Sequence, residues 1–460
     1  MARLDEILGD TLERRKKAGR LRQLTVRSPE KIDFSSNDYL SLAADTELQR
    51  KILARLEERI CATERGEVAR GILGSGGSRL LDGNSEFAEQ LEEKIAGFHG
   101  APAALLFNSA YDANVGLLQC VPQPGDVILY DEAIHASSHE GMRLSRASAK
   151  IPFAHDSMTT ADSDSPNTGS HEGLEQVLQN LTKGHQGRAV REGSRNVFIC
   201  VEGIYSMDGS VAHLARVVDL VEKWLPRQNG YIIVDEAHSV GVLGPQGRGL
   251  VSALGLETKI WAIVQGFGKA LGSAGGVVLC SHTTRAYLVN YARTLIYTTS
   301  PAYSSLVSLD TIYDYLLAGN GDCRHDQLQQ LIAHTWHLLQ AMCSRLAAAA
   351  ASTTDAALVR VDRLQAKSPI IPIYTSSPRS LAAWCQQRGF MVRPIVAPTV
   401  PAGTERVRIC LHAMNSIGQV DALITTIEHW AREQKCLSTA QHMTSPGTVT
   451  GHSVLLKSNL

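Results

Sequence analysis

Residues 231–280 have the sequence YIIVDEAHSVGVLGPQGRGLVSALGLETKIWAIVQGFGKALGSAGGVVLC. This stretch contains three short apolar runs, YIIVD, IWAIVQ and GGVVLC, which polar and glycine-rich segments separate. Short apolar runs bounded by turn residues predict buried β-strands. The stretch therefore predicts neighbouring strands at the centre of a sheet.

The same pattern continues toward the N-terminus. AALLF at 103–107, DVILY at 126–130 and NVFICVEG at 196–203 alternate with helical stretches. Such alternation predicts an α/β fold in which helices cover a mostly parallel sheet. In folds of this kind the active site lies at the carboxyl ends of the strands.

The periodicity further predicts four parts of the chain. Near the end, SPIIPIY, MVRPIV and RVRICLH are expected as strands of a small α+β region, and the polar stretch from 157 to 195 as a mobile surface insertion. The N-terminal 25 residues are expected to contain an amphipathic helix with Leu4, Ile7, Leu8 and Leu12 on one face. The four parts are an N-terminal arm (1–60), a large domain (61–304), a small C-terminal domain (305–435) and a flexible tail (436–460).

Composition narrows the class of protein. A chain of 460 residues with 44% hydrophobic and 20% charged content predicts a globular enzyme with a large core. The formal net charge of -1 gives no global field toward nucleic acid or an anionic membrane. Nine cysteines without a CxxC pair favour neither a metal site nor disulfides, and predict a reducing compartment. We expect neither a signal peptide nor a transmembrane segment.

Asp235 and His238 stand at the end of the YIIVD run, in DEAH. Pyridoxal 5'-phosphate (PLP) is a strong electron sink only while a fixed carboxylate keeps its pyridine nitrogen protonated. Asp235 is placed for that task. Taken alone, Asp235 could equally cap the following helix, because Asp is a favoured cap residue.

Lys269 follows the next strand and lies among glycines in GFGKALGSAGG. Small residues let a planar cofactor approach the lysine closely, and burial lowers a lysine's pKa so that its amine can form an imine. A lone lysine in a glycine-rich turn is more often a solvated loop residue. Together with DEAH upstream, it favours a Schiff-base lysine.

Three further segments point to the same edge of the sheet. FNSAYDANVGLL enters a helix after a strand and offers the amides of Ser109, Ala110 and Tyr111 to a phosphate. DEAIHASSHEGMRLS supplies His135, whose flat ring could stack on a pyridine, and VEGIYSMDG supplies Ser206. A structural histidine and an ordinary turn serine remain the alternatives for the last two.

Taken together, these segments resemble the α-oxoamine synthase family of fold-type I PLP enzymes. The resemblance runs from Phe34 to about Ala431. Its segments are FSSNDYLSLA, GSGGSRLLDGNSEFAEQLEEKIAGFHG, FNSAYDAN, DEAIHASSHEGMRLS, VEGIYSMDG, VDEAHSVGVLGPQGRG, GFGKALGSAGG, LIYTTS and PTVPAGTERVRICLHA. It implies a large PLP-binding domain, a small C-terminal domain and a homodimer with a shared active site.

The resemblance also implies roles for single residues. Lys269 would form the internal aldimine, Asp235 would pair with the pyridine nitrogen, and His238 would bond the phenolic oxygen. His135 would stack on the ring and Ser206 would bond near its oxygen. The amino-acid substrate would meet Arg408, which grips its carboxylate, and Asn37; Thr299 of LIYTTS would reach the phosphate from the neighbouring subunit.

One position departs from the family pattern. Where the family has Ser or Thr three residues before the lysine, this chain has Gly266. The phosphate therefore lacks one hydroxyl contact. Thr299, Ser273 or backbone amides are the candidates to replace it.

The family resemblance implies condensation of an amino acid with an acyl-CoA, with loss of carbon dioxide. VRPIVAPTVPAGTERVRICLHA is most similar to fungal-type members that join L-alanine to pimeloyl-CoA in biotin synthesis. Two alternatives remain open: a relative that releases a polyketide or fatty acyl chain onto an amino acid, and an aminotransferase. A non-catalytic partner subunit is disfavoured by the presence of Lys269.

The sequence ends in Ser458, Asn459 and Leu460, a relaxed form of the Ser-Lys-Leu peroxisomal signal. A polar, turn-rich tail would expose it. The expected address is the peroxisome or, if the match is accidental, the cytoplasm.

Overall fold

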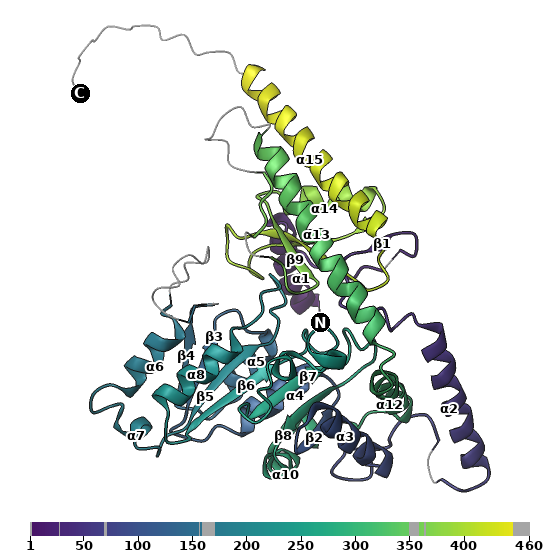
Figure 1. Ribbon diagram of the computed structural model, residues 1–460, viewed down its shortest axis with the longest axis vertical. Helices are drawn as coiled ribbons and strands as arrows, with labels where there is room; N and C mark the ends of the chain where they lie inside the picture. The colour runs from purple at the N-terminus through teal and green to yellow at the C-terminus, as the bar shows by residue number, and fades with distance from the viewer. Residues whose placement is uncertain are drawn as a thin grey trace.

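A seven-stranded sheet forms the base of the molecule (Figure 1). The computed structural model describes residues 2–26, 28–68, 71–155, 157–158, 171–348, 358–362 and 365–444, with side chains up to residue 435. The strand order is β2-β8-β7-β6-β5-β3-β4, and only β8 runs antiparallel to its neighbours in this sheet. The strands are β2 (Ala103–Phe107), β3 (Val127–Asp131), β4 (Ala149–Phe153), β5 (Val197–Glu202), β6 (Gly230–Asp235), β7 (Ala262–Gly266) and β8 (Gly276–Cys280). The predicted mostly parallel α/β sheet is confirmed.

The continuous apolar character of these strands reflects burial on both faces. Successive side chains of a strand point to opposite faces. In β3, Val127 and Leu129 join one hydrophobic core while Ile128 joins a second one. Strand β5 divides in the same way, with Ile199 in the first core and Phe198 in the second. Helices therefore cover both faces, as a parallel sheet requires.

Helices pack on the sheet by their apolar stripes. In α8, Leu214, Val217 and Val221 recur at helical spacing and are buried. The helices of this part are α3 (Glu86–His99), α4 (Ala110–Cys120), α5 (Ala136–Leu144), α6 (Leu174–Thr182), α7 (Arg188–Arg191), α8 (Leu214–Trp224), α9 (Leu250–Ala253), α10 (His282–Tyr291) and α11 (Arg293–Ile296), with the 3₁₀-helix η1 (Pro245–Gly247). Helices α6 and α7 fall within the stretch predicted as a mobile insertion, so its second half is regular structure.

A smaller layer sits above the large sheet (Figure 1). Its three-stranded antiparallel sheet has the order β11-β12-β9, and α13 packs along α15 beside it. The elements are α13 (Asp322–Ala348), β9 (Ile370–Tyr374), α14 (Pro378–Gln387), β10 (Phe390–Met391), β11 (Arg393–Ile395), β12 (Arg406–Cys410) and α15 (Ile417–Thr444). Helix α12 (Tyr303–Leu317) precedes them and packs against α3 beside the large sheet. The first hydrophobic core continues from the large sheet into this layer.

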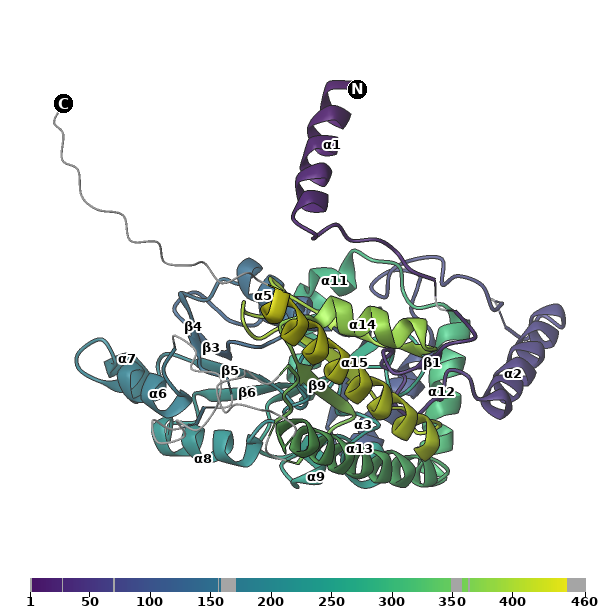
Figure 2. The same cartoon turned by 90° about the horizontal axis from the view of Figure 1, so that it is seen from above.

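The N-terminal segment joins the two layers. Strand β1 (Ile32–Asp33) pairs with β10, and α2 (Thr46–Glu64) packs against α12. Ahead of them, α1 (Ala2–Lys17) stands away from the rest of the molecule in Figure 2. Its predicted apolar residues are 52–61% exposed, so this helix face has no partner among the described residues.

Two predictions about the C-terminus have different outcomes. Helix α15 continues to Thr444, so it extends into the segment predicted as a flexible tail from 436. The Ser458–Leu460 tripeptide lies outside the described residues. None of the described helices has the length and hydropathy needed to cross a membrane.

Candidate active site

The ends of two adjacent strands place two carboxylates side by side. Strand β5 ends at Glu202 and β6 at Asp235, and these two residues are paired across the ladder. The turn after β7 brings in Lys269, whose ionisation responds to both carboxylates. The predicted edge of the sheet therefore gathers the predicted lysine and aspartate, together with Glu202.

The Lys269 amine is poised to lose its proton. The side chain is half-buried and has no hydrogen bond or ion pair with another described residue. Burial lowers its pKa below the ordinary 10.5, Asp235 and Glu202 oppose this, and Arg408 lowers it further. A neutral amine is the form that attacks an aldehyde or accepts a proton from carbon.

Asp235 is held rigidly at the end of β6. Its Oδ2 accepts a hydrogen bond of 2.6 Å from Asn114 Nδ2, and its Oδ1 accepts one of 2.9 Å from the Ala237 amide. Asn114 also donates to Ser137 Oγ at 3.0 Å, and Ser137 Oγ lies 2.8 Å from His135 Nδ1. One chain of hydrogen bonds therefore links Asp235 to His135, and neither side chain is free to turn independently.

His135 occupies the cap position before α5. Its Nδ1 accepts the Ser137 amide at 3.2 Å, while its own amide donates to Glu202 Oε1 at 2.5 Å. Burial lowers the pKa of His135, Asp235 opposes this, and Lys269 lowers it further. The imidazole is therefore neutral near pH 7, and the residue remains exposed to solvent.

A second hydrogen-bonded chain links His238 to Arg408. Tyr39 Oη lies 2.8 Å from His238 Nδ1 and donates to Asn37 Oδ1 at 3.1 Å. Asn37 Oδ1 also accepts from Arg408 Nη2 at 3.4 Å. Burial lowers the pKa of His238 well below 6.5, and Lys269 and Arg408 add to this. His238 is therefore a neutral, oriented imidazole.

Arg408 projects from β12 of the small sheet into this region. Its Nη1 donates to the Ser206 carbonyl at 2.8 Å, while its buried Nε has no partner among the described residues. An unsatisfied buried guanidinium N–H is costly without a ligand. Ser206 therefore meets Arg408 through its backbone, and the guanidinium keeps capacity to bind a carboxylate.

The expected phosphate cradle lies at the N-terminus of α4. Ser109 caps the helix by accepting the Asp112 amide at 3.0 Å, so the first amides of the helix, including those of Ala110 and Tyr111, have no partner within it. A Cβ added at Gly266 would lie 3.2 Å from the Ala110 Cβ. The residue that departs from the family pattern thus faces the start of this helix.

Two of the three candidates to replace the missing hydroxyl can be located. The Thr299 carbonyl accepts a hydrogen bond of 2.8 Å from Asn108 Nδ2 of the same chain. Asn108 directly precedes Ser109, the cap residue of α4. Ser273 Oγ instead donates to Ser308 Oγ at 3.1 Å. Thr299 is therefore near the helix N-terminus of its own chain, and its action across a subunit boundary stays a prediction.

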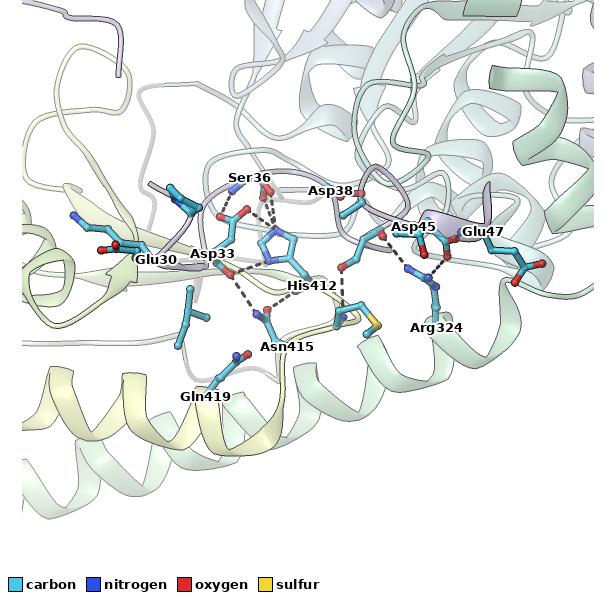
Figure 3. A pocket seen from close by; sticks show the side chains of 17 residues that line it. Glu30, Asp33, Ser36, Asp38, Asp45, Glu47, Arg324, His412, Asn415 and Gln419 are labelled. Carbon is cyan, nitrogen blue, oxygen red and sulfur yellow. Dashed lines mark hydrogen bonds and ion pairs between the residues drawn. The ribbon is translucent and has the colours of Figure 1, made fainter. Parts of the chain in front are cut away.

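A cavity of about 710 Å³ is lined by Ser36 and Asp38 of the N-terminal segment together with Arg324 and His412 (Figure 3). Neither Lys269 nor Arg408 lines it. There, His412 Nε2 lies 2.9 Å from Ser36 Oγ, and its Nδ1 lies 3.1 Å from the Asp33 carbonyl. These contacts attach the N-terminal segment to His412, which follows β12 of the small layer.

Sequence reasoning missed Glu202, Asn114, Ser137 and Tyr39. Glu202 had a readable signal, since NVFICVEG and YIIVDEAH are adjacent strands that both end in a carboxylate. Tyr39 stands two residues after the predicted Asn37. Asn114 and Ser137 gave no signal, because their partners become neighbours only when α4 and α5 pack together.

This arrangement fits PLP as the cofactor. Lys269 offers an uncommitted amine, Asp235 a fixed carboxylate, and α4 the amides of its first turn. These groups match the aldehyde, ring nitrogen and phosphate of PLP, respectively.

Comparison with known proteins gives the same picture. The family model for aminotransferase class I and II matches residues 29–427. The 8-amino-7-oxononanoate synthase of Emericella nidulans is 45% identical over 94% of this chain and 97% of its own length. The aminoacyl transferase sphA of Aspergillus fumigatus is 34% identical over 89% of this chain and 83% of its own.

Solved structures share the fold. A serine palmitoyltransferase from S. paucimobilis with a bound PLP–myriocin aldimine has a TM-score of 0.73 at 22% identity, covering 95% of this chain and 99% of that one. An 8-amino-7-oxononanoate synthase from Francisella tularensis has a TM-score of 0.64 at 24% identity, covering 89% and 100%. The expected fold-type I architecture is thus confirmed.

The electrostatics of Lys269 can be tested without cofactor. We expect Asp235→Asn to lower the pKa of the Lys269 amine further, because the aspartate charge stabilises the ammonium form. Competitive acetylation of the cofactor-free protein across pH, with peptide mass spectrometry, measures this pKa. Glu236→Gln is the control, since Glu236 is buried next in sequence but does not act on Lys269. An unchanged or raised pKa in Asp235→Asn would contradict the arrangement.

Proposed function

Because the chain belongs to the aminotransferase class I and II family, and within it to the PLP-dependent α-oxoamine synthases, we propose that it condenses L-alanine with pimeloyl-CoA. The reaction releases coenzyme A and carbon dioxide and gives 8-amino-7-oxononanoate, a step of biotin synthesis. The observation that carries the proposal is the 45% identity to the Emericella nidulans synthase over 94% of this chain. The arrangement around Lys269 supports the chemistry.

The residues of the site divide the work. When bound, PLP supplies an electron sink for negative charge on the amino-acid α-carbon. Lys269 would hold the cofactor and, as a neutral amine, would accept the α-carbon proton. Asp235 keeps a proton on the ring nitrogen, and Asn114 keeps Asp235 in place. His238 would bond the ring oxygen from the orientation that its contact with Tyr39 fixes.

The substrate side is formed by Arg408, Asn37 and His135. Arg408 has a buried N–H without a partner and therefore gains a hydrogen bond when a carboxylate arrives. A neutral His135 can donate a hydrogen bond to the thioester carbonyl as its oxygen gains negative charge. Together they favour a bond between the α-carbon and the carbonyl carbon.

The second candidate is condensation with a longer acyl chain. The aminoacyl transferase sphA of Aspergillus fumigatus is 34% identical to this chain and supports it. An aminotransferase would use Lys269 and Asp235 in the same way without releasing a thiol. A panel of amino acids and acyl-CoA thioesters separates the three, with thiol release as the readout and the product identified by mass. Thiol release with L-alanine and pimeloyl-CoA alone is the expected result.

A homodimer that shares its active sites is part of this proposal. Leu73, Leu81 and Tyr297 are 72–81% exposed, and the segments that carry them are tied together where the Ser300 amide donates to the Gly77 carbonyl at 2.9 Å. Exposed apolar residues that cluster in this way favour a covering partner. A second copy would cover them and bring Thr299 to the neighbouring site. Analytical ultracentrifugation measures the oligomeric state, and a monomer with full activity would refute it.

Lys269→Ala is expected to lower thiol release by roughly 10³-fold or more, since both the covalent anchor and the proton acceptor are lost. The visible absorption of covalently held cofactor should disappear while the far-ultraviolet circular dichroism stays. Lys259→Ala is the control, because Lys259 is exposed and pairs with Glu222 away from the site. Normal turnover of Lys269→Ala would refute the mechanism.

Arg408→Ala should raise the KM for the amino acid by roughly tenfold or more, and the KM for the thioester little, because a charge-assisted carboxylate contact is lost. Steady-state kinetics with each substrate varied in turn measures both constants. Arg379→Ala, on the exposed surface of α14, should leave both unchanged. Equal increases in both KM values would remove Arg408 from the carboxylate site.

A further inference from the structure

The loop from Ile204 to Val211 connects the two layers beside Arg408. A bridge between Ile204 and Val211 closes the loop into a hairpin. On its outer side, the Ser206 carbonyl accepts from Arg408 Nη1 at 2.8 Å and the Gly209 carbonyl accepts from Ser368 Oγ at 2.7 Å. The position of this loop therefore helps to fix the position of the guanidinium.

His155, two residues after β4, ties the other side of the loop to the large sheet. Its Nδ1 lies 2.9 and 3.1 Å from the two carboxylate oxygens of Asp131, at the end of β3. Its Nε2 lies 3.0 Å from Ser210 Oγ and 3.5 Å from Asp208 Oδ2. The histidine is 5% exposed, so these contacts are protected from water.

The contacts require both ring nitrogens to be donors. The Ser210 hydroxyl donates its hydrogen bond to Asp208 Oδ1 at 2.8 Å. Its oxygen must therefore accept the hydrogen bond from His155 Nε2. Asp131 can only accept, so Nδ1 also carries a proton. His155 is thus a buried imidazolium between two carboxylates. Burial alone would lower the pKa of His155, but its hydrogen bonds to Asp131 and Asp208 raise it well above 6.5.

The charged groups around His155 are few. Asp131 and Glu132 face it from the end of β3, where a Glu132 oxygen accepts the His155 amide at 3.1 Å. Asp208 faces it from the loop, and the Tyr205 ring packs edge-on at 4.4 Å. Burial raises the pKa of Asp208, yet the hydrogen bond from His155 lowers it to about 2. The pair therefore stays charged throughout the neutral range.

We propose that His155 is a positioning residue for the amino-acid substrate. Its imidazolium fastens Asp208 to Asp131, which holds the loop so that the Ser206 carbonyl orients Arg408 toward the substrate carboxylate. This inference rests on the proposed function for the role of Arg408, but not for the bridge itself. Without the bridge, Asp208 is a half-buried carboxylate lacking its cation, and the loop moves to solvate it more fully.

The first test separates the two substrates. His155→Gln keeps the approximate volume but cannot donate to both sides, and we expect the amino-acid KM to rise about tenfold, as for loss of one charge-assisted hydrogen bond. The thioester KM should change by less than about twofold, the range of a neutral substitution. His99→Gln is the matched control: His99 is a buried histidine whose hydrogen bonds go to Arg248, Tyr313 and Gln265 and not to the loop, so both KM values should stay unchanged.

The second test needs no activity. In the cofactor-free protein, the raised pKa means that the bridge contributes its full stability below pH 6.5 and loses it as pH rises through the folded-state pKa. The difference in Tm between wild type and His155→Gln should therefore be largest near pH 6 and shrink at alkaline pH. A difference that grows with pH would show a neutral histidine and overturn the proposal.

If His155→Gln does not fold, Asp208→Asn decides the question, because the amide keeps the shape of the loop and removes only the charge that His155 binds. It should give the same selective rise in the amino-acid KM. An unchanged amino-acid KM, or equal rises for both substrates, overturns the positioning role. Absence of thiol release in wild type would instead refute the proposed function, while the pH test of the bridge would still stand.

Discussion

The balance of charge around one half-buried amine, that of Lys269, constrains the arrangement of the residues around it. In the proposed mechanism Lys269 acts as a neutral amine. Burial lowers its pKa toward that form, while Asp235 and Glu202 favour the ammonium form. In a site of low polarity each of these effects is large. The carboxylates therefore cannot be placed loosely. Asp235 accepts two fixed hydrogen bonds, and Glu202 spends one oxygen on the amide of His135.

That requirement explains why so many distant segments converge on one edge of the sheet. The ends of β5 and β6 bring the carboxylates, α4 brings Asn114, and the N-terminal segment brings Tyr39 to His238. The small layer brings Arg408 on β12. Hydrogen bonds outside the site hold two of these segments in place: His412 binds the N-terminal segment, and His155 binds the loop that carries Ser206. If the proposed site is correct, hydrogen bonds that never touch a substrate fix the positions of its residues.

The sequence was informative where local chemistry leaves a pattern. Apolar runs gave six of the strands of the large sheet, and the short motifs DEAH and GFGK gave Asp235, His238 and Lys269. Strand β4 was not predicted, because its sequence AKIPF contains a lysine and a proline instead of a continuous apolar run. These residues are typical of an edge strand. The partners of these residues were harder to find. Asn114 and Ser137 meet only through the packing of α4 on α5, and the role of the Ser206 backbone depends on a small layer folded from the far end of the chain.

Gly266 shows how a departure from a family pattern can be accommodated by its surroundings. A Cβ at this position would lie 3.1 Å from the Ala237 Cβ and 3.2 Å from the Ala110 Cβ, closer than most real contacts. Glycine therefore lets α4 and the DEAH turn approach each other closely, and a serine side chain would require one of them to shift. The start of α4 therefore lies close to the strand end that leads to Lys269. Phosphate binding by backbone amides needs no side chain, so this close approach is a physical reason for the site to tolerate Gly266.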